Sequence, residues 1–309
     1  MKAVRFQEYG GPEVLEVVNV PEPSPGQGKV VVRVVAAGIN PGESAIRSGA
    51  MKEVFPADFP EGQGSDLAGV ISSVGEGVED VSVGDAVISM SDSRNAHAEY
   101  ALLPADRVTS KPAELDWAVA GSLYVVGTTA EVMIRAVRPK RGETVIVSGA
   151  AGGVGTLVTQ LALRAGARVI AVASEANHET LRGWGAEPVS YGDGLKKRIL
   201  SLTPDGAQAL LDAYGGGYVD LALGMGVPPD RIETIIDFDA VQRHGVHGDG
   251  MSTLQDPITA VAKLASLLAS GELELPIKAR FPLERVADAY REVDSRHGLG
   301  KVVLDVSSA

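Results

Sequence analysis

Residues 144–155 read TVIVSGAAGGVG, and this stretch decides the fold prediction. Its first five residues are typical of a buried strand, and the glycines that follow mark a tight turn. After the turn, apolar side chains recur at the spacing of one helix face: Val154, Leu157, Val158, Leu161, Ala162 and Ala165. Gly166 predicts the end of that helix, and residues 168–173 predict a second strand. Together they form a βαβ unit, which indicates a parallel sheet with helices on both faces.

The glycine-rich turn at residues 149–155 predicts a dinucleotide site. Glycine permits the tight turn, lets a pyrophosphate approach the bare backbone, and allows the helix to pack closely on the strand. Free amides at the start of the helix then face the phosphate oxygens. We therefore predict that Ala151, Gly152, Gly153 and Val154 contact the cofactor. An ordinary turn is the alternative, and Ala150 stands at the first glycine of the usual G-x-G-x-x-G pattern.

The end of the second predicted strand bears on the choice between NAD and NADP(H). NAD usually requires a carboxylate there to bind the ribose 2′-hydroxyl, whereas this chain has Ala173 and Ser174. The missing acid favours NADP(H), whose 2′-phosphate would be bound by Ser174, Arg182 or nearby amides. Glu175 follows directly and would make NAD possible if its side chain folded back onto the ribose. We interpret it instead as a solvated glutamate at a helix start.

The rest of the sequence indicates a second, β-rich part. Apolar runs separated by Pro- and Gly-rich turns predict strands at residues 14–18, 29–35, 67–74, 83–88 and 98–102. Further strands are expected at residues 209–213, 232–236 and 301–306, and a helix at 257–270. A chain of 309 residues that is 45% hydrophobic can form two separate cores. We therefore predict a β-rich domain in the first part of the chain and a parallel-sheet domain after it.

Composition argues against several functions. The chain has no cysteine, which excludes disulfides, a thiolate nucleophile and a cysteine-ligated zinc. Its net charge of −12 is spread without a basic block, so we expect no nucleic-acid partner. No stretch reaches the roughly 18 apolar residues of a membrane span, and the N-terminus does not resemble a signal peptide. We expect a cytoplasmic protein that does not bind membranes.

The histidines give no sign of a metal centre. Their positions show no ligand spacing such as H-x-x-x-H, and we expect no metal site: they are His97, His178, His244, His247 and His297. His244 and His247 lie in a segment where either could contact the cofactor. Ordinary loop histidines are the default interpretation of both.

Seven motifs follow one another along nearly the whole chain: Ala37–Pro41, Gly64–Val70, Val83–Asp85, Ala98–Tyr100, Gly127–Ala130, Ala150–Gly155 and Gly300–Leu304. In this order they resemble the zinc-free quinone oxidoreductases of the medium-chain dehydrogenase/reductase superfamily, the relatives of zeta-crystallin. The resemblance implies an α/β fold in which residues 1–115 and 272–309 form a GroES-like, β-rich catalytic domain. Residues 116–271 would form a Rossmann domain with a doubly wound parallel sheet. It also implies an active site between the domains, and a homodimer joined through edge strands of the cofactor domains.

Two positions bear on the chemistry. Zinc-containing alcohol dehydrogenases of this superfamily hold a catalytic zinc with a cysteine near Asn40 and a histidine near Ser65, and this chain has neither ligand. Without a Lewis acid a simple alcohol lacks an activator. A quinone or an α,β-unsaturated carbonyl spreads the arriving charge over a conjugated system, so a few hydrogen-bond donors suffice. We predict NADPH-dependent hydride transfer to such an acceptor; an enoyl-thioester reductase of secondary metabolism and a non-catalytic NADPH-binding protein are the alternatives.

Three residues are candidates for the catalytic site. By resemblance, Asn40 would orient the substrate or the ribose, unless it is only a turn residue ahead of a proline. Thr129 would contact the nicotinamide ribose or amide, and its alternative is a buried hydroxyl at a helix start. Arg47 is a candidate for binding an acceptor oxygen, although an exposed loop arginine is commoner. No Tyr–Lys or Ser–His–Asp arrangement indicates a proton donor, so we expect water to protonate the product.

The resemblance also assigns residues on the adenosine side of the cofactor. Tyr191 would stack near the adenosine phosphate, although the lysine that often accompanies it is replaced in residues 175–178. Gly215 and Gly216 follow a predicted strand at the carboxyl end of the sheet, where doubly wound folds bind ligands, and the cofactor would lie against them. A flexible glycine loop is the alternative.

Overall fold

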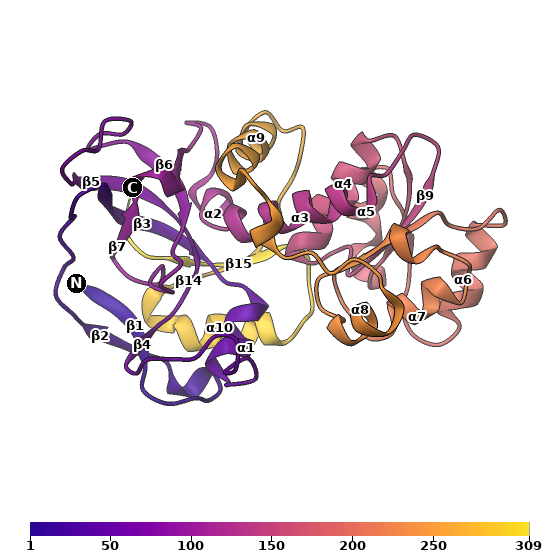
Figure 1. Cartoon of the computed structure of the whole chain (residues 1–309), viewed down its shortest axis with the longest axis horizontal. Coiled ribbons are helices and arrows are strands. Elements are labelled where there is room, and N and C mark those ends of the chain that lie inside the picture. The colour runs from indigo at the N-terminus through magenta and orange to yellow at the C-terminus, as the bar shows by residue number, and fades with distance from the viewer. Residues whose placement is uncertain (309) are drawn as a thin grey trace.

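The predicted βαβ unit is present in the computed structural model, which describes residues 1–308 (Figure 1). It consists of β9 (Thr144–Ser148), α4 (Gly153–Arg164) and β10 (Arg168–Val172). Three more strands complete a five-stranded parallel sheet in the order β11-β10-β9-β12-β13: β11 (Glu187–Val189), β12 (Ala209–Asp212) and β13 (Ile232–Thr234). The predicted Rossmann-like sheet is thereby confirmed.

Alternation along the central strands explains why helices cover both faces of this sheet. Val145 and Val147 of β9 pack on one side, in a core shared with α3 (Leu123–Val137), α4 and α9 (Pro257–Ala269). Ile146 points to the other side, towards α6 (Leu195–Leu202), α7 (Tyr218–Leu223) and α8 (Phe238–His244). A short helix, α5 (His178–Gly183), links β10 to β11. Residues on both faces of the central strands β9 and β12 are therefore buried, as expected for a parallel sheet.

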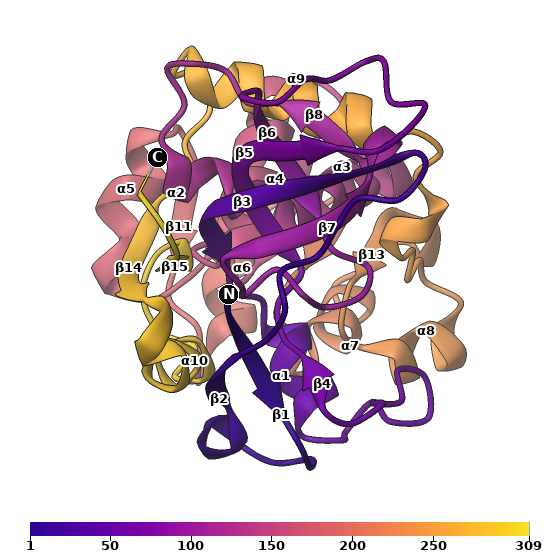
Figure 2. The same ribbon diagram turned by 90° about the vertical axis from the view of Figure 1, so that its left-hand side faces the viewer.

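The β-rich half contains two sheets; it lies at the left of Figure 1 and faces the viewer in Figure 2. The larger has the order β14-β15-β3-β5-β6-β8, with β7 also paired to β3. Its strands are β3 (Lys29–Gly38), β5 (Asp66–Val74), β6 (Ala86–Met90), β7 (Tyr100–Pro104), β8 (Val108–Ser110), β14 (Ile277–Pro282) and β15 (Lys301–Asp305). The smaller has the order β2-β1-β4, from β1 (Lys2–Phe6), β2 (Glu16–Asn19) and β4 (Glu61–Gly62).

Three helices complete this half, namely α1 (Pro41–Arg47), α2 (Trp117–Ala120) and α10 (Val286–Asp294). Strand β15 pairs antiparallel with β3, so the last residues of the chain join the half that the first hundred begin. Both chain ends accordingly lie on the same side in Figure 1. Both the GroES-like half and the parallel sheet agree with the predicted fold class.

Several predicted boundaries were wrong by a few residues. The strand expected at 14–18 begins at residue 16, because Pro12–Val14 forms a turn of 3₁₀ helix. Strands expected at 83–88 and 98–102 lie at 86–90 and 100–104, and the strand expected at 232–236 ends at residue 234. Such ends depend on tertiary pairing that local propensity does not contain.

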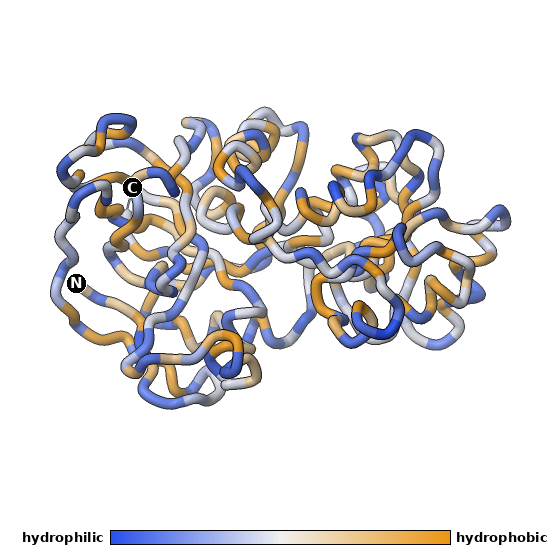
Figure 3. Tube along the Cα trace, viewed as in Figure 1, coloured by the Kyte–Doolittle hydropathy of each residue, from blue (hydrophilic) through white to orange (hydrophobic). Residues whose placement is uncertain are grey.

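Helix α3 connects the two halves. Its buried residues share one apolar cluster with the five-stranded sheet and with Ala68 and Ile88 of the β-rich half. Figure 3 shows hydrophobic segments concentrated along the strands and this central helix. No helix within residues 1–308 is long and apolar enough to cross a membrane.

Candidate functional site

The glycine-rich turn has the geometry that a pyrophosphate site requires. Gly149 adopts a positive φ of 58°, and a Cβ on Gly155 would lie 2.0 Å from the Gly149 carbonyl oxygen. Only glycine therefore permits α4 to start this close to the turn. Gly152 is exposed, and a Cβ there would meet only the Gly149 oxygen, at 3.3 Å. The residues present thus fit a dinucleotide: an open, bare backbone faces solvent at the first turn of a helix, whose leading amides have no partner within the helix.

This turn touches the other half of the molecule directly. Gly300 donates its amide hydrogen to the carbonyl oxygen of Ala151 at 2.8 Å, and Gly152 and Gly300 form a parallel bridge. The stem of Lys301 packs over Gly153, where an added Cβ would lie 2.7 Å from the lysine Cδ. The predicted cofactor residues 151–153 therefore lie against the start of β15, at the junction of the two halves.

A buried ion pair lies beneath this junction. The ammonium of Lys301 donates to Asn40 Oδ1 at 2.5 Å and to the Ile39 carbonyl at 2.8 Å, and is 3.7 Å from the Asp66 carboxylate. Asp66 also accepts the Asn40 amide at 3.0 Å and the Val125 backbone amide at 2.8 Å. Asp66 and Lys301 are almost completely buried.

Burial shifts both partners towards their neutral forms. It raises the pKa of Asp66 to about 6, against the opposing attraction of Lys301 and the Asn40 hydrogen bond. It lowers the pKa of Lys301, again opposed by the charge of Asp66. Loss of hydration penalises each charge, and the partner recovers part of that penalty. The pair is therefore sensitive to any change that admits water or removes one member.

Asn40 is placed by the start of α1, where it is the N-cap residue. Its backbone amide and its side chain both contact the carboxylate of Glu43, forming a capping box with Pro41 at the first helical position. Because Oδ1 receives Lys301 and Nδ2 reaches Asp66 and Glu43, both ends of the Asn40 amide are engaged within the protein. The side chain predicted to orient a ligand is thus fixed by the network around it.

Glu43 extends the network into the β-rich half. Its carboxylate accepts the Ser65 amide at 2.8 Å and the Tyr290 hydroxyl at 2.7 Å, and Gln63 donates to the same hydroxyl at 2.6 Å. His97 lies 3.5 Å from the Tyr290 hydroxyl, and burial lowers the pKa of its imidazole. Zinc-containing relatives were expected to carry metal ligands near positions 40 and 65. In this chain the residues there, Asn40 and Ser65, instead donate hydrogen bonds to protein carboxylates.

Arg47 does not lie where the sequence suggested. It is 1% exposed at the end of α1, with its guanidinium 4.5 Å above the Tyr290 ring and its Nε donating to the Gly11 carbonyl at 3.2 Å. It is neither an exposed loop residue nor directed at the glycine-rich turn. Its environment indicates that it supports the packing of α1 on α10.

Thr129 is on α3, close to the buried pair. It is half-buried, and its hydroxyl donates to the Val125 carbonyl at 2.7 Å. Val125 is the residue whose amide binds Asp66, so α3 carries Thr129 one turn after the contact with the network. The Thr129 hydroxyl therefore lies near the junction of the two halves, and its one hydrogen bond is to the Val125 carbonyl.

Tyr191 and Gly216 line one surface pocket, of about 500 Å³, together with Tyr214 and Tyr218. Tyr191 is 52% exposed, so its ring is available to a ligand. The three glycines 215–217 all adopt positive φ. The pocket thus brings two of the residues predicted for the adenosine side together at the ends of β11 and β12.

Asp212 fixes the strand ends beneath this pocket. Its carboxylate accepts hydrogen bonds from the Ser148 hydroxyl, from the Thr234 hydroxyl at 2.8 Å and from the Gly215 amide at 3.0 Å. One buried acid therefore holds the carboxyl ends of β9, β12 and β13 in place. This residue was not predicted, because its partners come from three separate strands.

The residues predicted for the 2′-phosphate lie after β10. Ser174 is half-buried and its hydroxyl accepts from Asn177 at 3.1 Å, while Arg182 is exposed and makes no ion pair with any residue in 1–308. Glu175 is also exposed, and its carboxylate lies 3.5 Å from the Ser190 hydroxyl, after β11. Glu175 is therefore an exposed acid at the first position of a short 3₁₀ helix, as the sequence suggested, and its one contact is with the end of the neighbouring strand.

Comparison with known proteins adds family information. Residues 26–138 match the family described as "Alcohol dehydrogenase GroES-like domain", and residues 153–226 and 194–304 match two families described as "Zinc-binding dehydrogenase". The chain is 38% identical to quinone oxidoreductase of Rattus norvegicus, covering 98% of this chain and 97% of that protein. It is 30% identical to the NADPH-dependent alkenal/one oxidoreductase of Arabidopsis thaliana, covering 98% and 79%. A mycobacterial protein solved in complex with NADPH superimposes with a TM-score of 0.85 at 30% identity, covering 98% and 99%.

Proposed function

The chain belongs to the quinone oxidoreductase family of the medium-chain dehydrogenase/reductase superfamily and is an NAD(P)H-dependent oxidoreductase of the quinone oxidoreductase and alkenal reductase type, and from this premise we propose that it transfers hydride from NADPH to a quinone or an α,β-unsaturated carbonyl compound. The observation that carries the proposal is the contact between the glycine-rich turn and the start of β15. This contact supports the proposal because it brings the glycine-rich turn next to a buried, charged network from the other half.

The proposed cofactor contacts lie at the turn and the start of α4. The backbone at Ala151, Gly152, Gly153 and Val154 would bind the pyrophosphate, because Gly152 is exposed and the first amides of α4 have no partner within the helix. The pocket beside Tyr191, Gly215 and Gly216 would take the adenosine. When bound, the nicotinamide supplies the hydride, and the protein supplies position and charge.

Asn40 and Thr129 are the polar residues that we propose to place beside the nicotinamide. Lys301, Asp66 and Glu43 hold Asn40 in place, and its amide nitrogen already donates to both carboxylates, so we expect Asn40 to position the nicotinamide and not to donate to the acceptor oxygen. A fixed position contributes to the rate by orienting the reacting atoms. Arg47 is left out of the catalytic proposal because its guanidinium is committed to Tyr290 and Gly11.

Positions 40 and 65 support a reaction without a zinc ion at that place. Asn40 and Ser65 stand where zinc-ligating residues were expected, and the whole chain contains no cysteine. The Asn40 amide is instead bonded to an ammonium and to two carboxylates. Conjugated acceptors therefore suit this site better than simple alcohols.

The direct test mixes the purified protein with NADPH and a panel of quinones, short 2-alkenals and enones, and follows the near-ultraviolet absorbance of NADPH. We expect turnover with at least one class of conjugated acceptor and none with saturated aldehydes or simple alcohols plus NADP⁺. No acceptor-dependent oxidation of NADPH by any compound would overturn the proposal. Turnover restricted to acyl-thioesters would replace it by an enoyl-thioester reductase.

A variant of Arg182, with a matched control, distinguishes loss of the 2′-phosphate contact from a general loss of structure. Arg182→Ala should raise the Kd for NADPH about tenfold, since a charge-assisted hydrogen bond contributes roughly 1.5 kcal/mol, and should leave the Kd for NADH unchanged. Arg138→Ala is the control, because Arg138 lies at the opposite end of the sheet, after α3. Equal losses for NADPH and NADH would exclude Arg182 as the 2′-phosphate contact.

A further inference from the structure

Glu233, His247 and Asp249 converge at the edge of the parallel sheet. Glu233 is the middle residue of β13, and the segment after α8 returns alongside this strand. His247 donates its amide to the Ile232 carbonyl at 2.9 Å, and its carbonyl accepts the Thr234 amide at 3.1 Å. These two bonds form a single parallel bridge between residues 233 and 247. Bridge partners project to the same face of a sheet, which is why the two side chains meet.

The carboxylate of Glu233 is buried and only half satisfied. The residue is 0% exposed; one oxygen accepts the Asp249 amide at 3.0 Å, while Oε2 has no hydrogen-bond partner within residues 1–308. The nearest cation in sequence, Arg231, forms its ion pair with Glu143 at 2.6 Å. A buried carboxylate oxygen without a partner is costly, and such groups commonly mark a missing water or ion.

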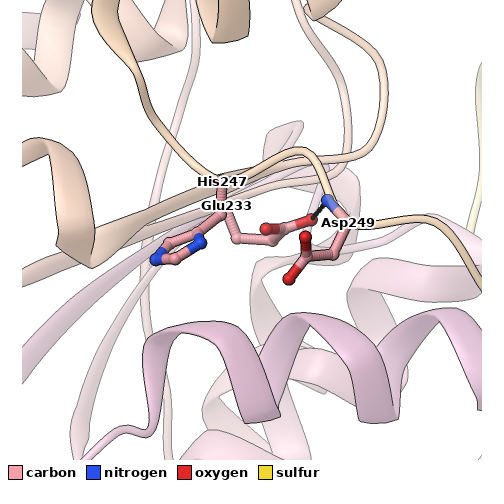
Figure 4. Close-up of side chains that lie close together, drawn as sticks. All are labelled: Glu233, His247 and Asp249. Carbon is pink, nitrogen blue, oxygen red and sulfur yellow. Dashed lines mark hydrogen bonds between the residues drawn. The ribbon is translucent and has the colours of Figure 1, made fainter. Parts of the chain in front are cut away.

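The ring of His247 is oriented as a metal-binding imidazole would be. Its Nε2 lies 3.2 Å from the Asp230 carbonyl oxygen, which can only accept, so the proton of the neutral ring resides on Nε2. Nδ1 then carries a free lone pair. Figure 4 shows the Glu233 and Asp249 carboxylates next to each other, with the His247 ring beside the Glu233 side chain. A backbone carbonyl that fixes the far nitrogen in this way is a usual companion of histidine ligands.

We propose that Glu233, His247 and Asp249 bind one divalent transition-metal ion of the Zn²⁺ type, at a site separate from the dinucleotide turn. One ligand atom from each residue lies within 4.8 Å of the other two. Ligands about 2.1 Å from a tetrahedral ion are roughly 3.4 Å apart, so modest side-chain rotation completes the site. One imidazole and two carboxylates suit a borderline metal, whereas Mg²⁺ and Ca²⁺ prefer oxygen ligands alone.

The charge of the cluster supports the same assignment. When both carboxylates are ionised, they and a neutral imidazole carry −2, which one divalent ion would neutralise. The fourth position would hold water or another ligand. The expectation of no metal site considered only the spacing of histidines, and two of these three ligands are acids that the fold brings to one histidine. The ion would hold the segment 247–249 against β13. Two residues further along the chain, Met251 contacts Thr128 of α3.

The test is direct metal binding, which does not depend on any reductase activity. Metal-free protein, prepared with a chelator, is titrated with Zn²⁺ by calorimetry and with Co²⁺ by visible absorption, and Mg²⁺ and Ca²⁺ serve as comparisons. We expect one equivalent of Zn²⁺ with a micromolar or lower Kd, a Co²⁺ spectrum typical of low coordination number, and a rise in Tm of several degrees with saturating Zn²⁺.

Variants locate the ion. Glu233→Gln, His247→Ala and Asp249→Asn should each weaken Zn²⁺ binding at least tenfold, with unchanged circular dichroism showing that they fold. His244→Ala is the matched control: it removes a histidine from the same segment whose ring pairs with Asp220 at 2.8 Å, and should leave the Kd unchanged. No saturable Zn²⁺ binding below millimolar concentration, binding unaffected by Glu233→Gln, or tighter binding of Ca²⁺ or Mg²⁺ than of Zn²⁺ would overturn the proposal.

Discussion

Replacing Lys301 by methionine measures what the buried ion pair contributes to the free energy of unfolding. The substitution keeps the stem that packs over Gly153 and removes the ammonium. The Ile39 carbonyl and Asn40 Oδ1 then lose a donor, at about 1–3 kcal/mol in total. Asp66 loses its counter-charge as well.

Protonation of Asp66 limits the free-energy cost of removing the Lys301 charge. Burial raises the pKa of Asp66 to about 6 even with Lys301 present, and without the ammonium this pKa rises further. At pH 7.5 the folded variant therefore protonates Asp66. Protonating Asp66 at pH 7.5, about 1.5 units above its pKa in the unmodified protein, costs about 2 kcal/mol at 1.36 kcal/mol per unit. The expected loss is about 3–5 kcal/mol at pH 7.5, in the range for breaking a buried pair.

The pH dependence has a definite sign. A carboxyl whose folded pKa lies above its unfolded value of 3.8 favours folding when protonated, and this contribution is lost as the pH rises through about 6. At pH 5.5 Asp66 is largely protonated in both proteins, so the cost of Lys301→Met should fall by about 2 kcal/mol. Adding Asp66→Asn to the variant should remove that pH dependence.

Urea denaturation followed by tryptophan fluorescence provides the assay. The chain has two tryptophans, Trp117 in the β-rich half and Trp184 after α5, so a Trp184→Phe background isolates the half that contains the pair. Lys278→Met is the control: Lys278 pairs with Glu292 at 2.6 Å near the surface, and its loss should cost at most about 1 kcal/mol. Equal losses for Lys301→Met at both pH values, or a pH dependence that persists after Asp66→Asn is added, would refute the reasoning.

Three further perturbations follow from the site. Glu175→Gln removes the acid beside Ser190 and should improve NADPH affinity several-fold relative to NADH, measured as the ratio of the two Kd values; an unchanged ratio would show that the carboxylate does not reach the ribose. Gly155→Ala drives a methyl group to 2.0 Å from the Gly149 oxygen, so NADPH binding should fall at least tenfold by fluorescence titration, and unaltered affinity would contradict the proposed turn geometry. Tyr290→Phe leaves its buried partners without a hydroxyl and should lower the free energy of unfolding by about 1–3 kcal/mol in urea; a neutral effect would mean that water takes the place of the hydroxyl.

Local signals in the sequence predicted the cofactor half well. Strand β9, the turn and α4 are contiguous, and periodicity together with glycine placement identifies them without tertiary information. The same kind of signal was present for α1 and was missed: Asn40, Pro41 and Glu43 form a capping box with proline at the first helical position. Recognising that helix would have moved Arg47 from a loop to a helix end.

Local sequence patterns could not predict the buried network. Asp66 and Lys301 each fall within a recognised motif, but they come from opposite ends of the chain and meet only because β15 joins the sheet containing β3. The sequence predicted Glu233 only as part of a strand, and the bridge to residue 247 shows which segment covers it. Pairings between distant segments determine these sites, and one sequence does not specify them locally.

The position of β15 also imposes an order of assembly on the nascent chain. Every strand of the parallel sheet has been synthesised by residue 234, whereas residues 36–38 of β3 wait for residues 303–305 before their free edge is covered. Contacts of such long range form slowly, and an uncovered strand edge invites pairing with other chains. A chain that lacks β15 would therefore combine a complete parallel-sheet half with an aggregation-prone β-rich half, so the pairing of residues 303–305 with β3 is a late, closing step of folding.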